Sequence, residues 1–299
     1  MAILEIKNIT KSFGDKAVLK GLSLEVPEHS VFGFIGRNGA GKTTTMKAVL
    51  GLVSPDSGEI YVADEKVLRG QNRTNRYIGY LPDVPEFYSF MTAREYLSLC
   101  GESLCMSKED IKSRSEELLA LVGLAGEKHR IRGYSRGMKQ RLGIAQALLA
   151  RPKLLICDEP TSALDPIGRK EILDILLAAR EQTTVLFSTH ILSDAERICT
   201  DVAFLEGGKI ALQGSISELK KLRRTEEFTL ELKDASHIPA LLSRFPGSKA
   251  IGKETLSFSG GEEEMCALLA FIAKNKIPFS KLESCEPTLE ALFMEVTAK

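Results

Sequence analysis

The sequence predicts an α/β protein with a mixed sheet at its core, a helical insert and a small α+β domain at its C-terminal end. Three observations support this prediction. Apolar strands run directly into glycine-rich or acidic loops, and strand-like patterns give way to helical ones between about residues 80 and 150. The chain has 299 residues, enough for a full core and a second domain. We therefore expect one domain over residues 1–216, with its helical part at about 84–150, and another over 217–299.

A glycine-rich loop at residues 36–43, with the sequence GRNGAGKT, fits the phosphate-binding pattern of two glycines, a lysine and a hydroxyl residue. A buried strand is predicted just before it, at 31–35, and a helix just after it, at 44–52. Backbone N–H groups at a helix N-terminus can surround a phosphate with no side chain in the way. The loop therefore predicts a nucleoside triphosphate site. Its residues are Gly36, Arg37, Asn38, Gly39, Ala40, Gly41, Lys42, Thr43 and Thr44.

Two of these side chains have distinct expected roles. Lys42 is long enough to reach the outer phosphates, and the Thr43 hydroxyl is suited to bind Mg²⁺. Upstream, alternating residues predict strands at 4–9 and 18–26 with a turn at 11–16 between them. Phe13 falls in that turn. An aromatic ring there would either stack on a nucleotide base or pack beside the turn, and the sequence leaves both interpretations open.

Two apolar strands further along the chain end in residues with catalytic chemistry. The strand at 154–157 runs into Asp158 and Glu159, and the strand at 184–188 leads to His190. In α/β folds such strand ends lie beside the phosphate loop. We expect Asp158 to hold Mg²⁺, Glu159 to orient and deprotonate an attacking water, and His190 to contact the terminal phosphate. The alternatives are a strand that simply ends in polar residues and a structural histidine.

The helical insert has its own start signals. Residues 92–95 and 107–110 resemble capping boxes, the second with aspartate in the acceptor place. A third helix is predicted to begin near Ser135. Ser135 and Gly137 would make its N-terminus a second anion-binding site, whereas the alternative is a capped amphipathic helix with no special function.

Composition limits the choice of partners and compartment. Lys plus Arg and Asp plus Glu both number 40, and this balance argues against a nucleic acid partner. The six cysteines show no metal-like CxxC pairing, which favours a reduced cytoplasmic setting. No apolar run approaches the roughly 20 residues of a membrane span.

Taken together, these motifs resemble the ATP-binding-cassette (ABC) transporter ATPases over roughly residues 2–216. The matching parts are the base-stacking aromatic Phe13, the Walker A loop at 36–43, the signature at 134–138, Walker B at 154–159, the D-loop at 162–165 with Asp165, and the switch histidine His190. The resemblance implies catalytic roles for Glu159, His190 and Lys42. It also implies ATP contacts from Phe13, the loop residues, Ser135, Gly137 and Asp165.

The sequence departs from the family pattern in two motifs. The signature has Tyr134, Arg136 and Met138 where the commonest form has leucine, glycine and glutamine. Asp83 stands where the Q-loop usually has glutamine, and as an anion it can bind Mg²⁺ through water but cannot donate a hydrogen bond to phosphate. Both departures are similar to the ABC-2 branch that exports drugs, antibiotics, sodium or polysaccharide.

The resemblance further implies ATP and Mg²⁺ as cofactors and a homodimer or heterodimer that closes around ATP. Because no membrane span is predicted, the permease would be a separate chain that holds this protein at the cytoplasmic face of the membrane. The alternative is a soluble ABC ATPase that acts on ribosomes or nucleic acid. The extension at 217–299, with a β-α-β-β-α-β pattern and a final helix, is expected to be regulatory or to support the dimer.

Overall fold

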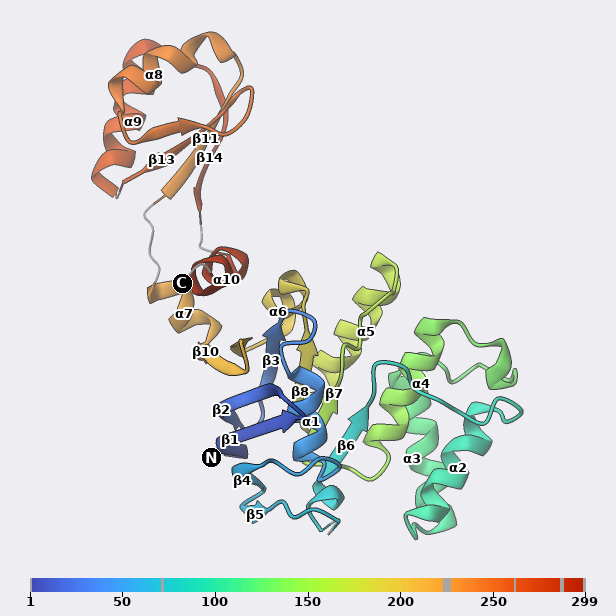
Figure 1. Ribbon diagram of the computed structural model, residues 1–299. Helices are drawn as coiled ribbons and strands as arrows, with labels where there is room; N and C mark the ends of the chain where they lie inside the picture. Colours follow the sequence, from blue (N-terminus) through green and yellow to red (C-terminus); the bar gives the residue numbers. More distant parts are fainter. Residues whose placement is uncertain (1, 71–72, 223–226, 261, 286–287, 298–299) are drawn as a thin grey trace. The chain divides into compact units, whose positions relative to one another are not determined.

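The computed structural model describes residues 2–70, 73–222, 227–260, 262–285 and 288–297. The chain divides into two compact units (Figure 1). The first is Met1–Ile216 together with Val296–Lys299, and the second is Ser217–Glu295.

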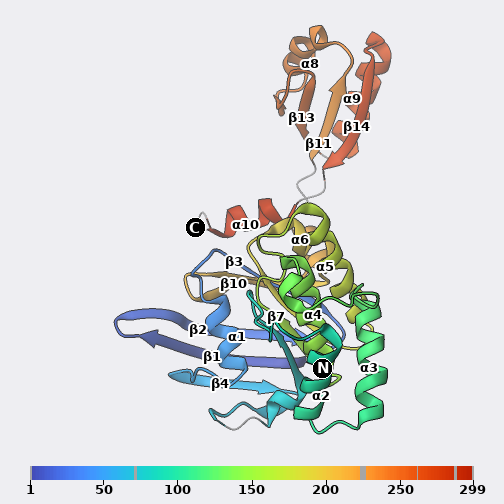
Figure 2. The same ribbon diagram turned by 90° about the vertical axis from the view of Figure 1, so that its right-hand side faces the viewer.

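In the described part of the first unit, a six-stranded sheet lies at the centre (Figure 2). The strand order is β10-β9-β3-β8-β7-β6, with β9, β3, β8, β7 and β6 parallel and β10 antiparallel at one edge. The strands are β3 Val31–Gly36, β6 Ile78–Leu81, β7 Leu154–Cys157, β8 Thr184–Thr189, β9 Asp201–Glu206 and β10 Lys209–Ser215. Because parallel strands end at the same edge, the loops after β3, β6, β7 and β8 are brought together there.

Alternate residues of the buried strands enter two different cores, one on each face of this sheet. In β7, Leu155 and Cys157 pack with helices α4 and α5, whereas Leu154 and Ile156 pack with α1 and the antiparallel strands. Covering both faces explains why β7 and β8 are almost continuously apolar. The helices of these layers are α1 Lys42–Val49, α4 Arg136–Leu148, α5 Pro166–Ala179 and α6 Leu192–Ile198.

A four-stranded antiparallel sheet packs over α1, in the order β2-β1-β4-β5. Its strands are β1 Ala2–Phe13, β2 Lys16–Pro27, β4 Ser57–Val62 and β5 Glu65–Lys66. The predicted turn at 11–16 is wrong in its extent, because β1 continues to Phe13 and pairs there with Lys16. Asp56 fixes this strand end: its carboxylate accepts hydrogen bonds from the Ser12 backbone N–H and the Lys11 Nζ, each at 2.7 Å.

The helical insert comprises α2 Ala93–Ser103, α3 Lys108–Leu121 and α4. The three predicted start signals are confirmed. Thr92 and Glu95 form a complete capping box, the Ser107 hydroxyl accepts from the Asp110 N–H, and the Ser135 hydroxyl accepts from the Met138 N–H. By contrast, the helix predicted at 44–52 is observed as α1 Lys42–Val49, since Gly51 adopts a left-handed φ of 68° just after the helix.

The second unit is an α+β domain with the predicted β-α-β-β-α-β order and a final helix. The described strands form an antiparallel sheet in the order β12-β13-β11-β14, the ferredoxin-like arrangement. Phe228 and Phe258 stack at its centre with ring centroids 5.3 Å apart. Helices α7 Ile216–Leu222 and α10 Leu289–Thr297 cross its two boundaries with the first unit. Between them lie β11 Glu227–Leu232, α8 Ile238–Arg244, β12 Ser248–Ala250, β13 Thr255–Ser259, α9 Glu262–Asn275 and β14 Phe279–Cys285.

The described helices are too short to serve as membrane spans. Helices α3 and α9, for example, have 14 residues each, whereas a span needs roughly 20 apolar residues. Across the residues that the structure describes, no helix has both the length and the apolar character that crossing a membrane requires.

Candidate functional site

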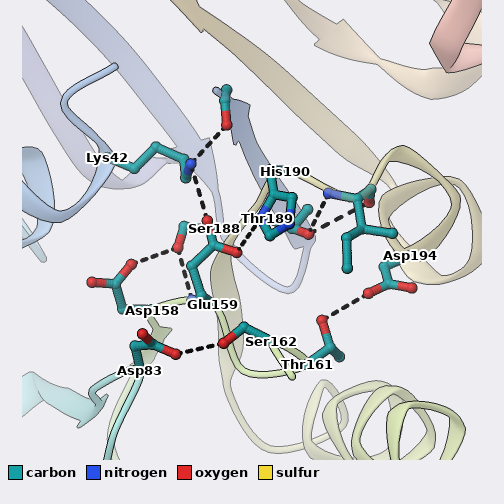
Figure 3. A network of polar contacts seen from close by, with 12 residues as sticks. Lys42, Asp83, Asp158, Glu159, Thr161, Ser162, Ser188, Thr189, His190 and Asp194 are labelled. Atoms are coloured by element: carbon teal, nitrogen blue, oxygen red, sulfur yellow. Dashed lines mark hydrogen bonds and ion pairs between the residues drawn. The ribbon is translucent and has the colours of Figure 1, made fainter. Parts of the chain in front are cut away.

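Four loops at one edge of the central sheet carry the predicted catalytic and metal-binding residues. Lys42 follows the loop after β3, Asp83 lies beyond the end of β6, Asp158 and Glu159 follow β7, and His190 follows β8. Figure 3 shows Lys42, Asp158, Glu159 and His190 in one network that includes Ser188, and Asp83 bonded separately to Ser162. Residues more than a hundred positions apart in the sequence are thus direct neighbours.

The phosphate loop needs its glycine at the start of α1. Gly41 caps this helix with a φ of 115°, a conformation that L side chains rarely adopt. A Cβ atom there would lie 2.8 Å from the Leu19 Cδ2 atom, closer than such contacts occur. Lys42 follows as the first helical residue, and its Nζ donates to the Gly36 carbonyl over 2.7 Å. The loop therefore holds backbone N–H groups and one ammonium group together at a helix N-terminus.

The Glu159 carboxylate lies between two partners. Its Oε1 is 3.0 Å from the Lys42 Nζ, and its Oε2 accepts a hydrogen bond from the His190 Nδ1 over 2.7 Å. Only 15% of the Glu159 side chain and 5% of the Lys42 side chain are exposed. Glu159 also has a left-handed φ of 48°, which costs a residue with a side chain about 1–2 kcal/mol. Such a held carboxylate can accept a proton from a water molecule positioned beside it.

Asp158 lies deeper, next to the hydroxyl of the phosphate loop. Its Oδ2 accepts from the Thr43 Oγ1 over 2.8 Å, and its Oδ1 accepts from the Ser188 Oγ over 2.7 Å. The Ser188 hydroxyl in turn accepts from the Glu159 N–H over 2.9 Å. Ser188 therefore ties together the backbone and side chain of the two acidic residues after β7.

The donor atoms of Thr43 and Asp158 fit a magnesium ion. A hydroxyl and a carboxylate are hard oxygen ligands, and here they lie 2.8 Å apart. Among the described residues, no cluster of three or more histidine, cysteine or acidic side chains could hold a metal alone. A magnesium ion at this place would therefore complete its coordination with water and phosphate oxygens, as it does in nucleotide sites.

A cavity of about 600 Å³ opens over this network. Its size lies within the range of small-molecule sites. Phe13, half exposed at 51%, lines it from the end of β1. The lining residues are Phe13, Lys16, Val18, Asn38, Gly39, Gly41, Lys42, Thr43, Thr44, Asp83, Glu159, Ser162 and His190.

Other predicted site residues lie outside this cavity. Ser135 caps α4, and Asp165 caps α5 by accepting from the Gly168 N–H over 2.8 Å. Gly36 is the last residue of β3. Ala40 packs against the core beneath the antiparallel sheet, and Arg37 is exposed. Gly137, near the start of α4, is likewise not among the described residues that line the cavity. Within one chain, the structure therefore does not bring Ser135, Gly137 and Asp165 to the nucleotide cavity.

The site residues predicted from the sequence leave out four residues that the structure brings to the site. Lys16, Val18 and Ser162 line the cavity, and Ser188 connects Asp158 to Glu159. Ser162 and Ser188 had a usable signal, since each lies close to a strand end that delivers predicted catalytic residues. Lys16 had no such signal, because its place in the cavity lining depends on the extension of β1 to Phe13, with which Lys16 pairs.

Two groups beside the acidic residues remain neutral. Burial raises the pKa of the Cys157 thiol far above its ordinary value, so it does not act as a nucleophile or metal ligand near neutral pH. Burial, with a smaller effect of the Asp158 charge, raises the pKa of Tyr80 to about 12. The chemistry of the site therefore rests on the carboxylates, Lys42 and His190.

The fold and the site define a nucleotide-binding ATPase of the phosphate-loop type, and comparison with known proteins gives its family. Residues 19–162 match the family model described as ABC transporter. The uncharacterized ABC transporter ATP-binding protein YxlF of Bacillus subtilis (strain 168) is 46% identical over 78% of this chain and 77% of its own length. The bacitracin transport ATP-binding protein BcrA of Bacillus licheniformis is 38% identical over 81% of this chain and 79% of its own.

A solved structure of the ATP binding subunit of an ABC transporter is also similar. It is 30% identical, has a TM-score of 0.65, and covers 74% of this chain and 92% of its own. The chain therefore belongs to the ATP-binding proteins of ABC transporters, whose general activity is ATP hydrolysis coupled to transport. The family resemblance and the α/β cassette fold predicted from the sequence are confirmed.

Proposed function

We propose that this chain hydrolyses ATP to drive export through a separate membrane permease, and that two copies close around ATP in each cycle. The observation that carries the proposal is the convergence of Lys42, Glu159 and His190 on the lining of one cavity. The name of the bacitracin transport relative supports transport as the process. A soluble ATPase acting on ribosomes or nucleic acid remains the alternative outcome of the experiment below.

In the proposed reaction, Phe13 stacks on the adenine and the loop N–H groups bind the phosphates. Lys42 exchanges its Glu159 partner for a phosphate oxygen. Glu159, oriented by His190, then takes a proton from the attacking water as the water oxygen bonds to the γ-phosphorus. The bond to the bridging oxygen breaks, which gives ADP and phosphate.

Magnesium would be held by Thr43 and Asp158, with Asp83 as an outer contact through water. When bound, it supplies positive charge that offsets the charge of the phosphates. The Asp158 side chain is kept in place by Thr43 and Ser188. Because Asp158 is already held in place, its side chain needs to move little when magnesium binds.

The signature helix supports the proposed dimer. Gly137 lies in the first turn of α4, yet a Cβ there would meet only Leu164, at 3.9 Å. This chain itself therefore leaves room at Gly137, as a phosphate bound to a second copy would need. The Ser135 hydroxyl and the N-terminus of the 13-residue helix α4 supply donors and a favourable dipole for that phosphate. The dimer would be formed by two copies or by a related partner, and Asp165 would contribute from its loop.

A permease-docking surface would be formed by Val84, Tyr88, Phe90, Arg130 and Arg132. Tyr88 and Phe90 are 56% and 61% exposed, with ring centroids 5.9 Å apart. The Arg132 N–H donates to the Ser89 carbonyl over 3.0 Å, so the exposed arginines run beside the aromatic pair. Exposed aromatic rings beside arginine are typical of binding surfaces. Through this docking surface the permease would hold the protein at the cytoplasmic face of the membrane.

The experiment is a pull-down of the tagged chain from gently solubilised native membranes. We expect recovery of a polypeptide with several membrane-spanning helices, and its loss when Tyr88→Ser and Phe90→Ser are combined. Leu104→Ser, which removes an exposed apolar side chain elsewhere, is the matched control. Recovery of ribosomal proteins or nucleic acid without a membrane protein would favour the alternative. The second unit, residues 217–299, would be an accessory domain that regulates the cycle or supports the dimer.

A further inference from the structure

Two loops of the cassette and the first residue of a helix meet at a single hydroxyl group. The Ser162 Oγ donates to the Asp83 Oδ1 over 2.7 Å and accepts from the Arg136 Nη2 over 3.1 Å. The Arg136 Nη2 is itself 3.5 Å from the Asp83 Oδ1. Asp83 comes from the loop after β6, Ser162 from the loop after β7, and Arg136 is the first residue of α4. These three residues are called the Asp83 clamp below.

The Asp83 clamp borders the nucleotide cavity. Asp83 and Ser162 line it together with Lys42 and Glu159, whereas Arg136 is not among the described residues that line it. The backbone of Asp83 is fixed as well, because the Nε2 of the buried Gln140 donates to its carbonyl over 2.6 Å. The carboxylate is therefore held by one side chain from the loop after β7 and by one from the start of α4.

An uncompensated carboxylate at this place would oppose the binding of phosphates. Asp83 cannot donate a hydrogen bond when ionised, and its negative charge repels the triphosphate. The Arg136 guanidinium supplies one positive charge within 3.5 Å of the same oxygen. Asp83 of the Q-loop and Arg136 of the signature thus form one neutral pair. This single contact explains why the sequence departs from the family pattern at both positions.

We propose that Arg136 and Ser162 are positioning residues for ATP hydrolysis, which hold Asp83 at the cavity and balance its charge. The inference rests on the proposed function, because it concerns ATP turnover at the same site. It adds a role within the chain for the signature helix, whose N-terminus is proposed to bind the ATP of a second copy. A shift of that helix would move Arg136, and with it the charge balance at this chain's own nucleotide.

The test is a double-mutant cycle of Asp83→Asn and Arg136→Gln in the full chain. Arg136 is half exposed, so neither change removes core packing. We expect Arg136→Gln alone to lower kcat/KM for MgATP by about threefold, since Arg136 and Asp83 are both about half exposed and such ion pairs couple weakly. The double variant should be more active than Arg136→Gln alone and should match Asp83→Asn alone, because without the carboxylate Arg136 has no charge to balance.

Two further variants separate charge balance from simple structural support. Lys139→Gln removes the same charge three residues further along α4 and should leave kcat/KM unchanged. Ser162→Ala removes the shared hydroxyl and should raise KM more than it changes kcat, because it loosens an Asp83 that remains charged. Folding is checked by thermal unfolding of each variant.

The outcomes distinguish this inference from the proposed function. If Asp83→Asn rescues Arg136→Gln, the positioning role is supported, because a merely structural arginine would not be rescued by neutralising its partner. If the effects add without rescue while the wild type hydrolyses ATP normally, the positioning role is wrong and the proposed function stands. A wild-type chain that neither binds nor hydrolyses ATP would overturn the proposed function itself.

Discussion

Replacing Glu159 by glutamine removes one negative charge from between Lys42 and His190 while it keeps the size of the side chain. Loss of a general base typically lowers turnover by about 10²–10⁴-fold. The Lys42–Glu159 pair at 3.0 Å has a Coulomb energy of about 5 kcal/mol at an effective dielectric constant near 20. Its net contribution is smaller, about 1.5–3 kcal/mol, because both groups give up water to form it.

This ion pair gives the variant a second expected effect. An ATP phosphate must replace the Glu159 carboxylate as the partner of Lys42, so the pair competes with ATP binding. In Glu159→Gln that competition is lost, and we expect ATP to bind more tightly, by up to about tenfold, or about 1.4 kcal/mol. Turnover and affinity therefore change in opposite directions.

The assay measures phosphate release at saturating MgATP and, separately, the equilibrium Kd for ATP. Glu181→Gln, which neutralises an exposed glutamate after α5, is the control and should behave as the wild type. Unchanged turnover in Glu159→Gln would refute the role of Glu159 as base. Weaker ATP binding in that variant would refute the competition with Lys42.

Three further predictions concern the nucleotide base, the magnesium contact and Asp194, a buried carboxylate on α6 that accepts a hydrogen bond from Thr161. Phe13→Ala should weaken ATP binding by about 1–2 kcal/mol and leave binding of inorganic triphosphate unchanged, because only the base loses its stacking partner; equal loss for both ligands in titration would contradict this. Thr43→Ala should raise the free Mg²⁺ concentration for half-maximal turnover about tenfold, since one hard oxygen ligand is lost, and an unaltered Mg²⁺ titration would argue against that role. Burial raises the pKa of Asp194 above its ordinary value of 3.8, so the folded state binds this proton more tightly than the unfolded state does. The free energy of unfolding therefore falls as the pH rises from 3.8 through the pKa of the folded state. Asp194→Asn should abolish this fall in denaturant unfolding followed over pH, and an identical pH slope in variant and wild type would disprove the assignment.

Much of the fold follows from local sequence patterns. The caps at Thr92, Ser107 and Ser135 mark the helices of the insert correctly, because each cap depends on residues within three positions. The strand ends that deliver Asp158 and His190 are also readable, since both faces of the central sheet are covered and the strands are apolar throughout.

The remaining features depend on contacts between distant segments. The extension of β1 to Phe13 relies on Asp56, which bonds to Ser12 from 44 residues away. The bond between Ser162 and Asp83 joins residues 79 positions apart, and no periodicity encodes which hydroxyl meets which carboxylate. The sequence therefore predicts Lys42, Asp158 and Glu159 as the central groups of the site. The side chains that orient them, such as Ser188, can be identified only in the tertiary structure.

The most direct test of the central claim is an experimental structure of the Glu159→Gln variant with ATP and Mg²⁺. We expect the triphosphate on the loop of one copy, in contact with Lys42 and Thr43, with the adenine on Phe13. A second copy should cover the γ-phosphate with Ser135 and Gly137. ATP bound away from this loop, or bound here in a chain that stays monomeric, would contradict the account.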